Sequence, residues 1–545
     1  MIRPMRLRAA CLAMVIASTV FAAAPEGPSP ADAPGLYPAG DFVVTTGDPA
    51  PLAPSAKLYF AKEWIAAPRD GVAVSGYATG VGAFDDVRAW SSTPGSTGTP
   101  GARPPLVWLA SPERVRGARI ARDASTVAIG GRDHPFALAP KLELNRSYFD
   151  ATSASFLSAR EVAMRGRWRG DTFEARTIWP QDFRLDDAVT VATLPAGAPP
   201  AQALRDLVRA DGGGARAPFS TRLLWERASG SRPWAGKAAL VVMVNGAQGD
   251  DDEAWGGHFA LGTGRVGADG GIADVLVDNF YSLDVVSEKG ILAAPVPLDN
   301  YLADLNSGQA WYRPSAMLVA ILADDAAPAL VQGALNRVYA QFWRHQLPYR
   351  HSMMNCTGIS VDTLRALGWN VPASEARASS IALAWLSVPW TLAKEGSVSQ
   401  ARVAYEYLTQ DRTRLFPAVA FETIGAELLR LAQGGTHAAA SGVERLLARD
   451  LEALVFVRVP QLPSSRAFGS WPVVSPAEYH GKVPRDPEER QIVPVPPRPF
   501  PSGLREADLL PETRRPSDLP LAVWALVGFA FAAALVAWAV RSLAH

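Results

Sequence analysis

The stretch YRHSMMNCTGISVDTLRALGW, residues 349–369, predicts a helix that begins at a cysteine. Apolar residues recur in it at near-helical spacing: Ile359, Val361, Leu364 and Leu367. Gly368 ends the pattern, and both Asn355 and Thr357 are candidate caps for the first turn. Cys356 is therefore expected at or just before a helix N-terminus. There the unsatisfied N–H groups and the helix dipole favour the thiolate, which is the nucleophilic form.

This cysteine has no obvious disulfide partner. The 545 residues contain 2 cysteines, and the other, Cys11, lies in a segment with the pattern of a secretory signal peptide. Arginines precede the apolar run AACLAMVIASTVF, and small residues follow it at positions 22–24. We expect residues 1–24 to be removed together with Cys11. In an exported protein, a single thiol is a buried small hydrophobe, an intermolecular link or a reactive nucleophile.

A second apolar segment, LAVWALVGFAFAAALVAWAV at 521–540, has about the 20 residues that cross a bilayer. Trp524 and Trp538 lie near its ends, where indole rings favour the membrane interface. Abundant Ala, Gly, Pro and Arg are typical of GC-rich bacterial coding. We therefore expect a single-pass protein of the bacterial inner membrane with its main body in the periplasm. The net charge of zero gives no reason to expect a nucleic-acid partner.

The remaining chain divides by composition, and the expected fold class is α+β. Residues 25–236 contain short apolar or alternating runs broken by Gly, Pro, Ser and Asp, which predicts a β-rich, sandwich-like domain. Residues 237–372 combine buried-strand patterns with the predicted helix PALVQGALNRVYAQFW and the cysteine helix. Residues 373–481 read as a helical extension, and the Pro-rich residues 482–520 as an extended linker to the membrane.

A cysteine nucleophile needs a base, and His258 is the best-placed histidine. It stands at the start of the predicted strand in GGHFALGTG. The next predicted strand, ADVLVDNFY, offers Asp278 or Asn279 to orient the imidazole. Because side chains alternate along a strand, only one of the two can face His258, and the pattern leaves the choice open. The other histidines considered are His345, His351 and His437.

Other polar segments suggest weaker roles. Trp255, Tyr312 and Arg313 are candidates to line a substrate groove, with Arg313 pairing to an anionic head group. The acidic run at 250–253 contains oxygen ligands of the type that calcium binds. Its spacing does not match an EF-hand loop, so we expect a solvated loop, and we expect neither a metal nor a cofactor.

Four segments together resemble a known enzyme superfamily: GGHFALGTGRV, VDNFYSL, YRPSAMLVAIL and YRHSMMNCTGISVDTLRALG. They look like the circularly permuted branch of the papain-like thiol enzymes, which includes the lecithin:retinol acyltransferase-like proteins and in which the histidine precedes the cysteine. The closest resemblance is to a family of bacterial periplasmic domains that includes the periplasmic part of a membrane lipoprotein N-acyltransferase. It covers residues 238–369.

The resemblance implies that Cys356 is the nucleophile, that His258 is the base, and that the cysteine helix packs on a small antiparallel sheet. Two features of this chain differ from the family. The residue before Gly-His is a glycine here, whereas the family more often has an aromatic residue at that position. This chain has one expected C-terminal span, whereas the acyltransferase has several. The expected function is a membrane-tethered thiol hydrolase or acyltransferase acting on ester or amide bonds of envelope lipids or lipoproteins. The alternatives are a peptidoglycan peptidase or amidase, and a non-catalytic envelope-binding scaffold with a degenerate Cys/His domain.

Overall fold

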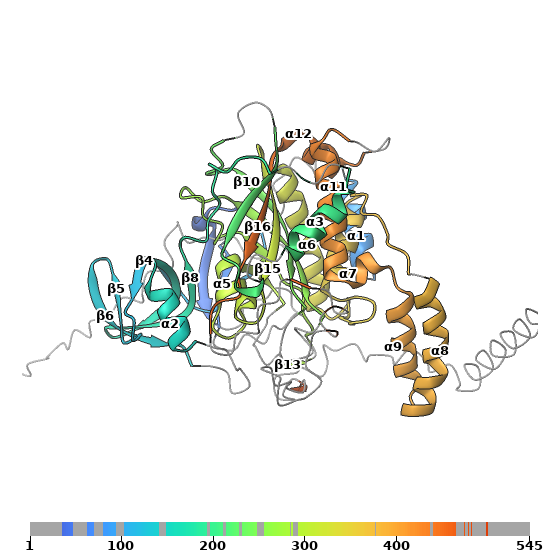
Figure 1. Cartoon of the computed structure of the whole chain (residues 1–545), viewed down its shortest axis with the longest axis horizontal. Helices are drawn as coiled ribbons and strands as arrows, with labels where there is room; N and C mark the ends of the chain where they lie inside the picture. Colours follow the sequence, from blue (N-terminus) through green and yellow to red (C-terminus); the bar gives the residue numbers. More distant parts are fainter. Residues whose placement is uncertain are drawn as a thin grey trace, which may run out of the picture.

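The computed structural model of the chain has the mixed α+β class expected from its sequence. It describes residues 35–46, 63–69, 80–93, 103–140, 149–192, 194, 197–210, 214–227, 232–247, 256–283, 285–286, 293–376, 378–435 and 440–464, and positions 473, 474, 478, 481, 498 and 499. Within this part, a central sheet separates a β-barrel from a layer of helices (Figure 1).

The central sheet has seven strands, and all neighbouring strands are antiparallel. In spatial order they are β14 (Pro295–Pro297), β12 (Leu276–Asp278), β11 (His258–Arg265), β10 (Ala238–Asn245), β15 (Ser315–Leu322), β16 (Leu451–Val459) and β9 (Ser220–Glu226). The two middle strands, β10 and β15, are buried at every position. Their nearly continuous apolar sequences fit strands that are covered on both faces.

Helices cover the sheet face on which Leu318 and Leu261 lie (Figure 1). This layer contains α1 (Ala83–Ser91), α3 (Pro200–Arg209), α6 (Ala326–Trp343), α7 (Cys356–Ala366), α11 (Pro417–Ala432) and α12 (Gly442–Asp450). Helix α11 approaches β15 closely because residue 425 is glycine. A Cβ there would lie 2.5 Å from the Leu204 side chain and 3.2 Å from that of Leu318.

The opposite face of the sheet contacts α5 (Leu298–Ala303) and, beyond it, the N-terminal β-structure. The expected sandwich is wrong for this part. Instead, β4 (Glu113–Ile120), β5 (Thr126–Ile129), β6 (Arg132–Leu138), β8 (Thr172–Pro180) and β7 (Val162–Arg169) form a closed barrel with α2 (Ala151–Ser158) against it. A separate sheet contains β1 (Phe42–Thr46), β2 (Trp64–Pro68) and β3 (Val107–Trp108).

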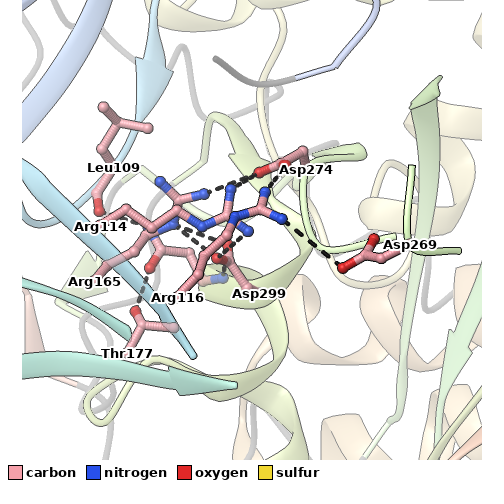
Figure 2. A network of polar contacts seen from close by, with 9 residues as sticks. Leu109, Arg114, Arg116, Arg165, Thr177, Asp269, Asp274 and Asp299 are labelled. Carbon is pink, nitrogen blue, oxygen red and sulfur yellow. Dashed lines mark hydrogen bonds and ion pairs between the residues drawn. The ribbon is translucent and has the colours of Figure 1, made fainter. Parts of the chain in front are cut away.

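Buried ion pairs join the barrel to the body of the protein (Figure 2). Arg165 of β7 donates from Nε to both carboxylate oxygens of Asp299, at 3.0 and 2.9 Å, and Arg114 of β4 lies 3.6 Å from the same carboxylate. Arg116 reaches Asp274 at 2.9 Å. Because Asp299 lies in the first turn of α5, the barrel holds this helix in place against the sheet.

Strand pairing extends the body beyond the segment 237–372 in which its strands were expected. Strand β9 comes from the preceding segment and β16 from the following one, and both join the central sheet. The expected helices of the extension do form. Helices α8 (Ala378–Glu395) and α9 (Val398–Thr409) make a hairpin that projects from the body, and α10 (Arg412–Leu415) connects it to α11 (Figure 1).

The expected signal peptide and membrane span, residues 1–24 and 521–540, lie outside the described residues. Of the expected linker, only Arg498 and Pro499 are described; they form β17, which pairs with β13 (Val285–Val286). In the part of the chain that the structure describes, no helix has the length and apolar character needed to cross a membrane.

Candidate functional site

Cys356 is the first residue of α7, as the sequence predicts. The helix is capped by Asn355, whose side-chain oxygen accepts a hydrogen bond from the Gly358 N–H at 3.0 Å. The Asn355 amide group donates to the Leu415 carbonyl at 3.0 Å, which fixes the cap against α10. Thr357, the other candidate cap, is the second residue of the helix. This hydrogen bond satisfies one N–H of the first turn and fixes the backbone just before Cys356.

His258 is the first residue of β11, and its ring is held by Asn279. The distance from His258 Nε2 to Asn279 Oδ1 is 2.8 Å, and both residues are buried. Because an amide oxygen can only accept a hydrogen bond, Nε2 carries the proton. The other ring nitrogen, Nδ1, is therefore the atom through which the ring can meet a further partner.

The Cys356 thiol is close enough for the His258 side chain to act on its pKa. Burial raises the pKa of Cys356, but the charge of His258 and a hydrogen bond to its side chain lower it more, with smaller contributions from the Phe259 backbone and Thr357. The pKa of Cys356 therefore falls from 9.0 to about 7. At neutral pH roughly half of the thiol is ionised, against about one part in a hundred for a thiol of pKa 9.

The register of the sheet decides between Asp278 and Asn279. Asp278 pairs with Leu261 and so shares its face, whereas Asn279, one position further along, shares the face of His258. Asp278 instead accepts a hydrogen bond from Gln332 Nε2 of α6 at 2.9 Å. Among the described residues, its buried second carboxylate oxygen has no hydrogen-bond partner, and burial raises the pKa of Asp278 to about 8. Asp278 is therefore not the residue that orients His258.

Tyr301 of α5 packs beside His258. The ring centroids of Tyr301 and His258 are 6.2 Å apart. The Tyr301 hydroxyl donates to Asn245 Oδ1, and Asn245 Nδ2 donates to Ser315 Oγ at 2.6 Å. All of these side chains are buried. Helix α5, which the barrel holds through Asp299, thus carries a residue that packs beside the imidazole.

Tyr349 is a site residue that the sequence analysis missed. The backbone N–H of Cys356 donates to its hydroxyl at 3.3 Å. This N–H lies at the helix N-terminus and is a candidate donor to the oxyanion that forms on an attacked carbonyl. Tyr349 was quoted in the opening stretch, but it lies in a loop, where no periodicity predicts the direction of a side chain.

Two of the three residues expected to line a substrate groove, Tyr312 and Arg313, are buried. The Arg313 side chain is buried and donates to the Gly246 carbonyl at 3.2 Å and to Gln309 Oε1. The Tyr312 hydroxyl donates to the Asn306 carbonyl at 3.1 Å. Both side chains are therefore hydrogen-bonded inside the protein. Trp255 and the acidic run at 250–253 lie outside the described residues.

The structure describes two of the other candidate histidines, His351 and His345. The His351 ring packs edge-on against Tyr349 at 5.2 Å, and His345 ends the turn after α6. His437 lies outside the described residues. Across the described ranges, no three His, Cys, Asp or Glu side chains are grouped so that they could hold a metal ion.

Comparison with known proteins gives no match: no family model, no curated protein and no solved structure is similar to this chain.

Proposed function

We propose that this protein is a cysteine-dependent hydrolase or acyltransferase, with Cys356 as nucleophile, His258 as base and Asn279 as the residue that orients the base. The observation that carries the proposal is the arrangement of the two residues: Cys356 begins α7, which packs on β11, and His258 begins β11 with its ring fixed by a 2.8 Å hydrogen bond to Asn279. In this arrangement His258 lowers the pKa of Cys356 to about 7. A cysteine buried only for packing needs no such partner, and burial alone would raise its pKa.

The chemistry is acyl transfer in two steps. His258 Nδ1 takes the thiol proton while Sγ attacks the carbonyl carbon, and the N–H of Cys356 can stabilise the oxyanion. The bond to the leaving oxygen or nitrogen then breaks, the leaving group receives the proton from His258, and a thioester remains. In the second step water or an amine attacks the thioester, His258 accepts its proton, the C–S bond breaks, and the thiolate returns. Hydrolysis and transfer differ only in the acceptor.

We further propose that the body has the permuted papain-like arrangement. Three observations support this: the chain order His258, Asn279, Cys356; the antiparallel pairing of β11 with β12; and the packing of α7, which Cys356 begins, against β11. In this arrangement the base and its orienting residue come from neighbouring strands, and the nucleophile comes from a helix N-terminus.

The proposed substrates are acyl bonds of envelope lipids or lipoproteins, and the proposed location is the periplasmic side of the bacterial inner membrane. The apolar run at 521–540 supports a membrane tether, and the Pro-rich linker would let the body work near the bilayer surface.

The test uses the full chain with vesicles that contain phospholipid and a diacylated lipopeptide, and separately with peptidoglycan. We expect fatty acid release or transfer, and an acyl mass added to the Cys356 peptide in mass spectrometry. Both should be lost in Cys356→Ala and His258→Ala but retained in His134→Ala, which changes a barrel histidine. Fatty acid release that persists in Cys356→Ala would overturn the assignment of the nucleophile. Release of peptidoglycan peptides without fatty acid would replace lipid by peptide as the substrate.

A further inference from the structure

We propose that the outward face of α8 lies on the surface of a lipid bilayer. The helix exposes several large apolar side chains, and Trp390 is the most exposed of them at 71%. Leu386 and Leu383 follow at 62% and 53%, and Ile381 is 41% exposed. An exposed leucine is ordinary by itself, but a group of large apolar side chains on one helix marks an interaction surface.

Helical spacing places three of these four residues on one side of α8. Leu383, Leu386 and Trp390 are three and four residues apart, so they form a single stripe. The opposite side packs on α9, where the Trp385 and Tyr405 rings meet edge-to-face at 5.5 Å and Ala384 is fully buried. The stripe therefore points away from the hairpin's own core.

The surface is also free of charge. From Ala378 to Ala393 the helix has no Asp, Glu, Lys or Arg, and Lys394 comes only in its last turn. A soluble surface helix normally presents charged residues to water on this side. With 18 residues, α8 is about 27 Å long, and it is not apolar enough to cross a membrane. Such a helix suits the interface, where it lies parallel to the membrane with its apolar side chains inserted.

A bilayer is the occupant that the rest of the chain favours. The sequence contains the expected span at 521–540, and the linker 482–520 would keep the body within reach of that membrane. The most exposed side chain of the stripe is a tryptophan, whose ring prefers the level of the lipid head groups.

The hairpin is connected to the segment that leads into the site. Ser352 Oγ, four residues before Cys356, donates to Glu406 of α9 at 3.1 Å. Behind α7, Asp411 accepts from the Ser374 N–H at 2.9 Å and pairs with Arg365 at 2.9 Å. Seating α8 on the bilayer would hold the loop before Cys356 near the lipid. The substrates would then be acyl lipids that the site reaches from the membrane surface. This step rests on the proposed function.

The experiment measures membrane depth without using activity. The full chain, with Cys11→Ala and Cys356→Ala to remove the native thiols, receives Leu386→Cys, is labelled with a polarity-sensitive NBD dye, and is reconstituted in phosphatidylethanolamine/phosphatidylglycerol vesicles. We expect blue-shifted emission and quenching by doxyl-labelled lipids. Arg132→Cys, an exposed position in the barrel, is the matched control and should show neither. A label at 386 that behaves like the one at 132 overturns the proposal.

A second arm tests the consequence for catalysis. With the native thiols retained, Leu383→Asp, Leu386→Asp and Trp390→Asp are combined in the full chain. Acyl release from vesicles should fall at least tenfold, while turnover of a short soluble ester should be unchanged. Equal activity of parent and variant on vesicles overturns the link between α8 and the substrate. If the dye at 386 reports insertion but the parent protein cleaves no acyl bond, the bilayer contact stands and the proposed function fails.

Discussion

Replacing His258 by Gln should raise the pKa of Cys356 and strongly slow its alkylation at neutral pH. The largest contribution to the pKa of this thiol is burial, which raises it. The two main effects that lower it both come from His258: its charge and its side-chain hydrogen bond. Glutamine keeps a polar side chain beside Asn279 but carries no charge and no basic nitrogen. With those effects removed, burial should bring the pKa to 9 or above.

The size of the effect follows from the ionised fraction. A pKa of about 7 leaves roughly half of Cys356 as thiolate at pH 7, whereas a pKa of 9 leaves about 1%. Because only the thiolate reacts with iodoacetamide, the rate at pH 7 should fall about fiftyfold. The parent rate should rise through a midpoint near pH 7, and the variant rate through a midpoint at or above pH 9. Restricted access of iodoacetamide to the buried thiol slows alkylation of both proteins but does not move either midpoint.

The assay follows carbamidomethylation of the Cys356 peptide by mass spectrometry between pH 5 and 10. His134→Gln, in the barrel, is the control and should keep the parent midpoint, and circular dichroism shows whether each variant is folded. A folded His258→Gln protein whose midpoint stays near 7 would refute the idea that the histidine stabilises the thiolate. A parent midpoint near 9 would refute the Cys–His pair itself.

Three further predictions concern the neighbouring residues. Asn279→Ala should lower kcat about a hundredfold without unfolding the protein, since it releases the ring of the base; a fall of less than twofold would show that the 2.8 Å contact does not position it. Asp278→Asn should keep activity and change the pH dependence of stability. The pKa of Asp278 is raised to about 8, so its favourable contribution is present below about pH 4 and is lost as pH rises through 8. The free energy of unfolding is measured in urea between pH 5 and 8. That of the parent should fall by about 1 kcal/mol per pH unit relative to that of the variant. If the two free energies change with pH in the same way, Asp278 is not a buried neutral acid. Arg165→Met should lower the free energy of unfolding by about 3–5 kcal/mol because it removes a partner from the buried Asp299. The control, Arg119→Met, breaks an exposed pair with Glu161 and should lower it by under about 1 kcal/mol. Equal losses would refute the role of the barrel interface.

The sequence predicted the features of the site that depend on local structure. The start of α7 at Cys356 and the start of β11 at His258 are both confirmed. Each follows from a short-range pattern: a cap residue before a helical repeat, and a run of strand residues after two glycines. The helices α6, α8, α9 and α11 are confirmed for the same reason.

The features that the sequence left open or predicted wrongly depend on contacts between distant segments. Arg313 was expected to pair with an anionic head group, but folding buries it against the Gly246 carbonyl. The β-rich segment closes into a barrel because β6 pairs in parallel with β8 and β7 pairs with β4, and neither pairing is visible in strand patterns. Strands β9 and β16, which are more than 200 residues apart, meet only in the folded sheet.

The sequence by itself placed the residues proposed to carry the chemistry, Cys356 at a helix start and His258 at a strand start, because helix capping and strand alternation act over a few residues. Only the tertiary structure decided how they work together. The register between β11 and β12 turned Asn279 toward His258 and Asp278 toward Gln332, because a shift of one residue moves a side chain to the other face of a sheet. Packing then brought the histidine to Cys356, from a strand and a helix that are far apart in the chain, and the charge of the histidine lowered the pKa of the thiol.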